Sequence, residues 1–443
     1  MDPAETMLET ARAAVRLAER KGAREAAAGA YRVRNVEVQW RDGRLERVSE
    51  ATTRGLGLEL YVDGRYASVS TSDLRPEAVD RFVEGTVRLT RTLAVDPYRA
   101  LPDPALYAPQ ARVDLDLEDR HYQENTPEAR RAVAEGLESA ARAAPGAEAI
   151  LSVTTSVGDT FAETFRVHSN GFEGSRRVTD FWVSAQVSAQ DPDGRRPEDW
   201  AAAAARHRSE LPALSDVGGE AARRALSRVG SRKGDSALLT MAVENRAAGR
   251  LLGSLLAALG ASALQQKRSF LEGQLGRKVA SRLLDLKDDP LLPRGLGSRL
   301  YDGEGLAARP FKVFEEGTLA SYYVDTYYGK KLGMAPTTRG PSNLTLKLGA
   351  KDRAGLLADL GEGILVTGFL GGNSNSTTGD FSLGVQGFRV REGRLGEPIG
   401  EMNVSGRHQE LWPRLSAVGN DPYRYSALRA PTLVFERVQF AGL

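Results

Sequence analysis

The chain contains no cysteine. This absence excludes disulfide bonds, zinc sites built from thiolates and cysteine nucleophiles, and it is compatible with a reducing compartment.

Histidine is almost as scarce. A helix that binds zinc needs ligands three or four residues apart, because only then do both side chains project from one face. No two histidines have that spacing, so we interpret them as surface or structural residues, which leaves open only a site assembled from distant positions. The four are His121, His168, His207 and His408.

The chain also lacks a long hydrophobic run and a dominant charge. Its longest apolar run, roughly 14 residues from Leu251 to Leu264, falls short of the ~20 residues that a membrane-spanning helix needs. The N-terminal stretch is amphipathic and lacks the apolar region of a signal peptide. With 60 basic and 58 acidic residues the formal charge is +2, so we expect neither a nucleic acid partner nor attraction to anionic lipid. These observations predict a cytoplasmic protein with no membrane segment.

What the chain does contain predicts an α+β fold. A length of 443 residues is too great for one ordinary core, and a small polar segment at 229–236 is our candidate boundary. We expect one domain at 1–230 and another at 231–443, each with mainly antiparallel sheet packed with helices, because regular β-α-β alternation is absent.

Turn dipeptides and periodicity locate several elements of the first half. Asp63-Gly64 is typical of a tight hairpin. We also expect strands to turn at Gly158-Asp159 and at Asn170-Gly171. The alanine-rich segment 198–208, "EDWAAAAARHR", is interpreted as a helix.

The segment 249–270, "GRLLGSLLAALGASALQQKRSF", predicts a helix built for close packing. Its leucines recur at steps of three and four and therefore share one face, while the small side chains of alanine and glycine cover the other faces. These leucines are Leu251, Leu252, Leu255, Leu256 and Leu259.

Two acidic clusters are candidates for metal sites. The first has alternating acids that would share one face of a strand, but no calcium-loop pattern accompanies them, so a solvated edge is favoured. The second runs into proline and is typical of a turn. The clusters comprise Asp114, Asp116 and Glu118, and Asp285, Asp288 and Asp289.

The polar segment 368–390 is either a hairpin connection or a loop that faces a substrate. Glycines let backbone amides approach a ligand, and the side chains supply hydrogen bonds. Neither a Walker loop nor a Gly-x-Ser-x-Gly nucleophile pattern is present. The candidate substrate-facing residues are Asn373, Asn375, Thr378, Asp380 and Phe381.

Several motifs, in order along nearly the whole chain, resemble the TldD/PmbA family, once labelled modulators of DNA gyrase, and within it the TldE (PmbA) branch. The motifs are "VHSNGFEG" (167–174), "SFLEGQLGRKVAS" (269–281), "TGDFSLGVQGFRV" (378–390) and "GNDPYRYSALRAPTLVFERVQFAG" (419–442).

This resemblance implies a two-subunit metallopeptidase. The TldD-type subunit carries a His-Glu-x-x-x-His helix which, with a later cysteine, holds zinc and supplies the general base. That helix would fall here at about 251–257, "LLGSLLA", and the cysteine near 427–433, "ALRAPTL". Neither ligand type is present, and Glu244 alone cannot make the site. The resemblance therefore assigns this chain no catalytic and no metal-binding residue and no cofactor of its own, with zinc expected in the partner subunit.

The resulting hypothesis is a non-catalytic pseudoenzyme subunit that forms a heterodimer with a TldD-like chain in proteolysis or maturation of unfolded peptides. We expect an extended peptide to bind by adding a strand to an exposed sheet edge. Two alternatives stay open. One is a homodimeric peptide-binding or scaffold protein, since homodimers of the isolated chain are conceivable. The other is a stand-alone hydrolase that uses carboxylates such as Asp325 and Asp380.

Overall fold

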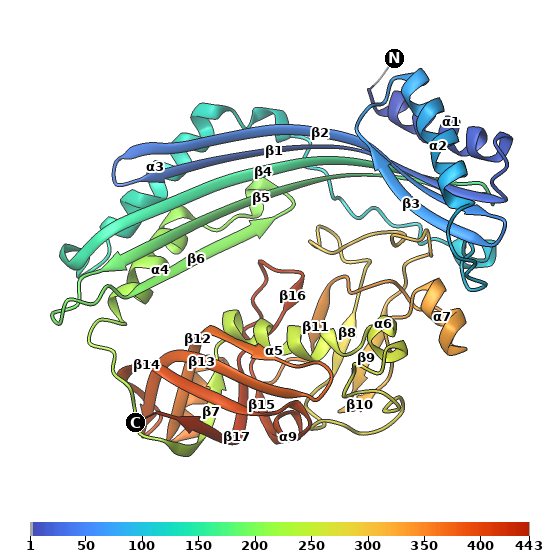
Figure 1. Cartoon of the computed structure of the whole chain (residues 1–443). Coiled ribbons are helices and arrows are strands. Elements are labelled where there is room, and N and C mark those ends of the chain that lie inside the picture. The colour runs from blue at the N-terminus through green and yellow to red at the C-terminus, as the bar shows by residue number, and fades with distance from the viewer. Residues whose placement is uncertain (1–2, 443) are drawn as a thin grey trace.

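A long six-stranded antiparallel sheet dominates the first half of the molecule (Figure 1). The computed structural model describes residues 3–442. The strand order is β3-β2-β1-β4-β5-β6. The strands span Glu25–Arg41 (β1), Arg44–Val62 (β2), Arg65–Thr71 (β3), Ile150–His168 (β4), Glu173–Ala189 (β5) and Glu198–Ala205 (β6).

Four helices cover one face of this sheet in two pairs. They are α1 (Pro3–Arg20), α2 (Pro76–Thr90), α3 (Pro127–Arg142) and α4 (Leu214–Leu226). The pair α1 and α2 packs on the end formed by β1, β2 and β4, and the pair α3 and α4 packs on the end formed by β4, β5 and β6. The opposite face of the sheet looks toward the second half of the chain (Figure 1).

Two of the three turns expected in this sheet are confirmed. Asp63-Gly64 joins β2 to β3, and Asn170-Gly171 lies between β4 and β5. The turn expected at Gly158-Asp159 is wrong, because both residues lie in the middle of β4, paired with β1 and β5.

Asp159 is instead part of a buried ion pair beneath the sheet. It is 1% exposed, and Arg130 of α3 donates to both of its carboxylate oxygens, at 2.5 and 3.0 Å. Asn125 adds a third hydrogen bond of 2.7 Å. A Gly-Asp dipeptide thus marks the docking point of a helix, and only the tertiary contact distinguishes it from a turn.

The helix expected at 198–208 is also wrong, because this segment forms the edge strand β6. Its burial alternates, with Ala201, Ala203 and Ala205 buried. Those small side chains face α4, which packs against the strand. Alanine has the highest helix propensity, but tertiary contacts override propensity, and here the alternate burial against α4 decides the outcome.

The second half contains two more sheets. One has the order β10-β9-β8-β11-β16 and the other β14-β13-β12-β7-β17-β15, with an extra pairing between β14 and β17 that curls the latter sheet on itself. The strands are β7 (Ala237–Val243), β8 (Leu286–Asp288), β9 (Phe311–Glu315), β10 (Thr318–Leu319), β11 (Leu344–Leu346), β12 (Gly363–Ser374), β13 (Asp380–Arg391), β14 (Arg394–Arg407), β15 (Leu415–Val418), β16 (Leu428–Arg429) and β17 (Leu433–Ala441). The helices are α5 (Asn245–Ala257), α6 (Ala261–Gln265), α7 (Thr326–Leu332), α8 (Arg353–Leu360) and α9 (His408–Leu411).

The leucine-rich segment forms α5 and, after a break at Leu259-Gly260, the short α6. Leu251, Leu252 and Leu255 are each at most 2% exposed. The expected packing helix is therefore confirmed, although it ends earlier than the sequence predicts. A glycine after a long apolar stretch costs helix stability, which favours the break.

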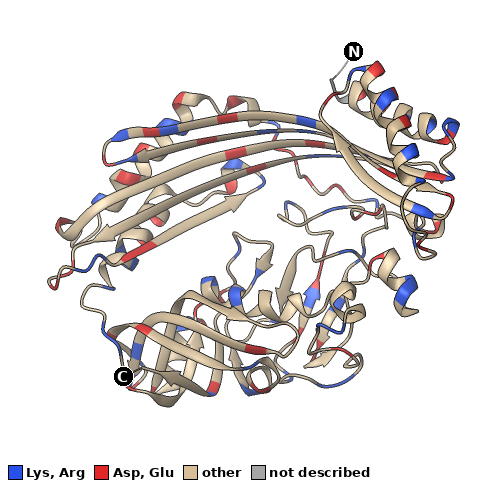
Figure 2. Ribbon diagram, in the orientation of Figure 1, with Lys and Arg blue, Asp and Glu red and all other residues tan. Residues whose placement is uncertain are grey.

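Together these elements confirm the expected α+β class, with mainly antiparallel sheets packed with helices. Parallel pairing occurs between β7 and β12 and between β11 and β16. No helix among residues 3–442 is long and apolar enough to cross a membrane. Acidic and basic residues are interspersed along the strands of the large sheet (Figure 2). The boundary at 229–236 stays a prediction.

The buried pair predicts a large stability effect. Replacing Asp159 by Ala leaves Arg130 buried without its counter-charge, and we expect a loss of about 3–5 kcal/mol in the free energy of unfolding. Urea denaturation of both variants measures it. The double variant Asp159→Ala/Arg130→Met removes the unpaired buried guanidinium group and is expected to recover most of the lost free energy of unfolding. A double variant no more stable than Asp159→Ala would contradict this account.

Candidate functional site

Helix α5 and the segment 427–433 lie side by side. A Cβ atom built on Gly249 would be 3.7 Å from a methyl group of Leu428, and both segments contribute to one hydrophobic core. These are the two places where the resemblance puts the zinc ligands of a TldD-type subunit. The fold therefore brings the two positions together in space.

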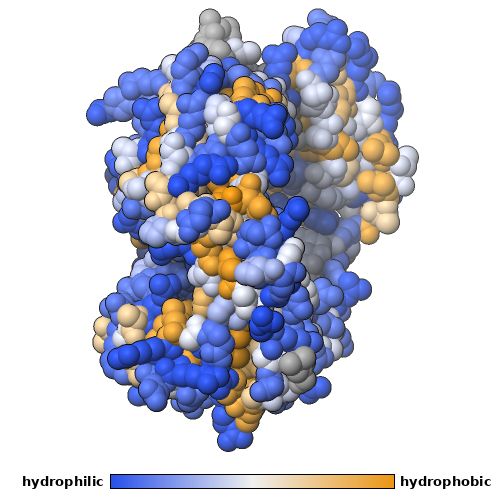
Figure 3. Space-filling model, turned by 90° about the vertical axis from the view of Figure 1, so that its left-hand side faces the viewer, coloured by the Kyte–Doolittle hydropathy of each residue, from blue (hydrophilic) through white to orange (hydrophobic). Residues whose placement is uncertain are grey.

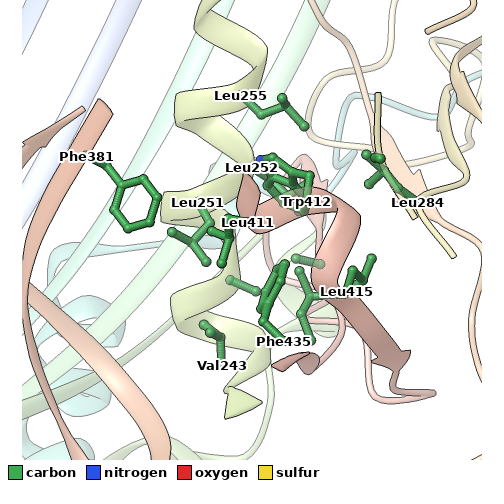
Figure 4. Packing of buried hydrophobic residues seen from close by; sticks show 14 of the residues in the cluster. Val243, Leu251, Leu252, Leu255, Leu284, Phe381, Leu411, Trp412, Leu415 and Phe435 are labelled. Atoms are coloured by element: carbon green, nitrogen blue, oxygen red, sulfur yellow. The ribbon is translucent and has the colours of Figure 1, made fainter. Parts of the chain in front are cut away.

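The side chains at these positions pack the core. Leu251, Leu252 and Leu255 point into a cluster that includes Trp412 and Phe435 (Figure 4). Its other labelled members are Val243, Leu284, Phe381, Leu411 and Leu415.

This set of residues does not fit a catalytic metal. Zinc takes thiolate, imidazole and carboxylate ligands, whereas α5 offers leucine and the segment 427–433 contains no such donor at all. Among residues 3–442, no three histidine, aspartate or glutamate side chains come together as a group that could hold a metal ion. Nearby Glu244 is engaged by Arg224 at 2.8 Å and by Arg353.

His408 is the one histidine beside a serine hydroxyl, and its tautomer excludes serine activation. Ser374 Oγ lies 2.8 Å from His408 Nε2, and the indole Nε1–H of Trp412 donates to Nδ1 at 3.2 Å. Since an indole nitrogen only donates, Nδ1 is the acceptor and Nε2 carries the hydrogen. Burial lowers the pKa of His408 to about 4. The ring is therefore neutral at pH 7 and donates to Ser374, so it cannot take that serine's proton.

The remaining histidines do not form a site either. Burial, with a smaller contribution from Arg166, lowers the pKa of His168 to about 3, and that ring accepts from Arg166 and contacts the Tyr107 hydroxyl at 3.0 Å. His207 lies beside the backbone carbonyl of Asp116, and exposed His121 pairs with Glu124.

Both acidic clusters are engaged in local contacts. Asp116 pairs with Arg294 at 2.5 Å, and Asp289 pairs with Lys287 at 2.7 Å. Asp288 is 1% exposed, accepts from Ser342 and Tyr323, and burial raises its pKa. The remaining members are Asp114, which accepts from a backbone amide, Glu118, which is exposed, and Asp285, which pairs with Lys312.

The candidate residues lie at the connection between β12 and β13. Asn373 is on β12, Asp380 and Phe381 are on β13, and the other two lie in the turn 375–379. Asn373, Asn375, Thr378 and Asp380 are exposed, and Asp380 accepts from Thr378 at 2.6 Å and from Arg407 at 3.0 Å. Those two bonds hold the pKa of Asp380 below its usual range. Phe381 is 6% exposed and lies with its ring 5.1 Å from that of His408. The first four side chains are thus available to a ligand, whereas Phe381 anchors the loop.

The sequence interpretation missed an arginine-lined cavity between the two halves of the chain. Its volume is about 770 Å³. The walls come from β5, β6, α4, α5, β12 and β13. We call it the arginine cavity after Arg196, Arg224, Arg228, Arg246 and Arg250. The available signal was the four-residue spacing of Arg224 and Arg228 and of Arg246 and Arg250, a spacing that would put each pair on one face of a helix.

Two of these arginines and Tyr423 occupy hydrogen-bond acceptors along the outer edge of β6. Its carbonyl groups at alternate positions accept from Arg228 (at Glu198), from Arg246 (at Trp200, 2.7 Å) and from Tyr423 (at Ala202, 2.5 Å). A peptide cannot add as a strand where these acceptors are already taken. An open edge lies elsewhere in this sheet, along residues 44–54 of β2, which extend past the end of β3 and are exposed.

Comparisons with known proteins agree with this architecture. Three family models match consecutive parts of the chain, namely PmbA/TldA metallopeptidase domain 1 (26–90), central domain (120–229) and C-terminal domain (237–442). The metalloprotease PmbA of Escherichia coli O157:H7 is 29% identical over 414 residues, which cover 92% of this chain and 90% of that protein.

Solved structures show the same fold. A protein of Bacteroides thetaiotaomicron, described as a proposed modulator of DNA gyrase, superposes with a TM-score of 0.94 at 39% identity and covers 98% of both chains. TldE from Thermococcus kodakarensis superposes with a TM-score of 0.88 at 19% identity, covering 98% of this chain and 100% of that one. The fold is thus that of a metallopeptidase-like α+β family. The chain belongs to the PmbA/TldD family.

The buried His408 predicts a specific loss of stability in acid. Its folded pKa of about 4 lies below the ordinary 6.5, so the unfolded state binds the proton first as the pH falls. Stability is therefore fully present above about pH 6.5 and falls between there and pH 4, by about 2 kcal/mol from pH 7 to pH 5. We expect His408→Gln to flatten this part of the pH profile by that amount in urea denaturation.

The control is His121→Gln, which changes an exposed histidine and is expected to leave the profile unaltered. In the wild-type protein, NMR is expected to show the His408 ring neutral down to about pH 5. A His408 resonance that titrates near pH 6.5 would contradict the assignment.

Proposed function

We propose that this chain is a non-catalytic, TldE-like subunit that pairs with a zinc-bearing TldD-like subunit to form a cytoplasmic peptidase for unfolded peptides. The observation that carries the proposal is the packing of leucines at 251–257 next to the segment 427–433, in the fold of a metallopeptidase family. In a complex formed by such a subunit, the partner holds the metal and carries out the cleavage.

The exposed part of β2 supports a role in holding extended peptide. Residues 44–54 offer an unpaired strand edge with alternating charges, and strand addition binds backbone with little regard to sequence. The exposed polar side chains of the loop at 373–380 are a second surface that we propose faces substrate.

A stand-alone hydrolase receives less support from the geometry. Asp325 caps α7 by accepting from the amide of Tyr328 at 2.7 Å, and Asp380 is held by Thr378 and Arg407. Burial raises the pKa of Glu304 to about 7, yet one of its oxygens accepts both the amide and the hydroxyl of Thr326. Each carboxylate has a structural task where it stands.

Reconstitution tests the proposal. We expect this chain and the TldD-like chain from the same genome to form a 1:1 complex by size-exclusion chromatography with light scattering. Cleavage of an unstructured fluorogenic peptide is expected only in the mixture, and a zinc chelator is expected to abolish it.

Two controls locate the chemistry. Replacing the glutamate of the partner's His-Glu-x-x-x-His helix by glutamine should preserve the complex and lower cleavage by about 100-fold or more. Inductively coupled plasma mass spectrometry of the isolated chain should find no stoichiometric zinc. Chelator-resistant cleavage by the isolated chain would favour the stand-alone hydrolase. Peptide binding without turnover, even with the partner present, would favour the homodimeric binding protein.

A further inference from the structure

The arginine cavity holds more positive charge than its own acids compensate. Of its five arginines, Arg224 is paired with Asp199, Glu220 and Glu244. For the other four, residues 3–442 provide no carboxylate within 4.0 Å. These four are Arg196, Arg228, Arg246 and Arg250.

The two acids in the cavity wall are already engaged. Asp199 accepts from Gln386 at 3.2 Å in addition to its contact with Arg224, and Glu198 accepts from Gln186 at 3.0 Å. Arg228 and Arg246 reach only backbone carbonyl groups of β6. Both are half-buried, and burial, with Arg224 close by, lowers the pKa of each.

Half-buried cations with no carboxylate in direct contact are costly. More distant carboxylates, Asp199 for both arginines among them, offset only part of the desolvation. The Nε atoms of Arg228 and Arg246 are shielded from solvent and have no hydrogen-bond partner in the described structure. A guanidinium group matches a carboxylate in a bidentate geometry. An anion that enters this cavity would therefore supply the missing charge.

Two neighbouring side chains narrow the class of anion. Trp200 is 53% exposed, with the guanidinium carbon of Arg246 4.6 Å from its ring centre, so an apolar surface adjoins the charge. Gln386 is 6% exposed, and its Oε1 accepts no hydrogen bond within the described residues. A ligand that combines a carboxylate, an apolar group and an N–H donor satisfies all three features. A peptide has that composition.

We propose that the arginine cavity binds a carboxylate of a peptide, with Arg246 and Arg250 as the principal contacts. This inference rests on the proposed function only in taking peptides as the ligand class. Arg246 and Arg250 stand on the first turns of α5, the helix whose later turns pack the core. The chain would thus select acidic or C-terminal peptide segments and hold them beside the position that corresponds to the partner's zinc helix.

Binding of four matched peptides tests the proposal. The peptides share one unstructured sequence and a fluorescent label, and differ only in Glu or Gln at the centre and in a free or amidated C-terminus. Fluorescence anisotropy is recorded on the isolated chain and on the complex with the TldD-like partner. We expect at least one carboxylate-bearing peptide to bind about tenfold more tightly than the uncharged one, and added salt to weaken that preference. Comparison of Glu with Gln at the centre, and of the free with the amidated C-terminus, shows whether a side-chain or a terminal carboxylate is bound.

The variants Arg250→Gln and Arg246→Gln are expected to remove the preference. Arg250 is exposed and makes only a 3.4 Å contact to the carbonyl of Gly372, so Arg250→Gln keeps the test valid if Arg246→Gln fails to fold. The control is Arg88→Gln, which changes an exposed arginine of α2 that pairs with Glu84 at 3.0 Å and is expected to bind as the wild type does.

Equal affinity for all four peptides on both the chain and the complex, or an unchanged preference in Arg250→Gln, would overturn the proposal. So would tighter binding of inorganic phosphate than of any peptide, measured by competition. Failure to form a complex while acidic peptides still bind would refute the proposed function alone. Cleavage by the complex with no charge preference would refute this inference alone.

Discussion

The ion pair between Arg224 and Glu244 joins the two halves of the chain. Arg224 comes from α4, which packs on the large sheet, and Glu244 immediately precedes α5 in the second half. Their side chains are 10% and 3% exposed and lie 2.8 Å apart. Arg224 also donates to the carbonyl of Thr367 on β12 at 3.0 Å. Buried charges of this kind are tolerated only when an opposite charge lies close, so the pair helps to fix where α5 stands relative to the sheet.

Because α5 is fixed in this way, its two faces have separate tasks. The leucine face fills the core, where each buried leucine contributes about 2–3 kcal/mol of hydrophobic stabilisation. The opposite face carries Arg246 and Arg250 at the start of the helix and small residues farther along, and it borders the arginine cavity. On the side of the molecule shown in Figure 3, hydrophilic residues predominate and hydrophobic ones gather in narrow strips. The face shown there therefore offers charged and polar contacts in place of a broad apolar surface.

The sequence predicted those parts of the fold that local chemistry determines. The turns at Asp63-Gly64 and Asn170-Gly171 and the packing helix follow from dipeptide geometry and from periodicity. The errors have tertiary causes. Alanines at 201–205 form an edge strand because α4 covers alternate residues, and Gly158-Asp159 continues a strand because Arg130 neutralises the carboxylate from another element. The arginine cavity was missed for the same reason, since α4 with the turn after it and α5 bring their arginines together only in the folded chain. The role of the loop at 373–381 stays a prediction.

If the chain pairs with a zinc-bearing subunit as we propose, leucine on α5 in place of zinc ligands has a physical logic. Two histidines and a glutamate in the core beside Trp412 and Phe435 would need a metal to satisfy them, and without one each buried polar group would cost free energy. Leucine at these positions removes that cost and stabilises the subunit whether or not metal is present. The two arginines that we propose as the principal peptide contacts, Arg246 and Arg250, stand on the first turns of the same helix and line the arginine cavity. In the role that we propose, the stability of this chain does not depend on a metal centre, and its cavity is available to hold peptide.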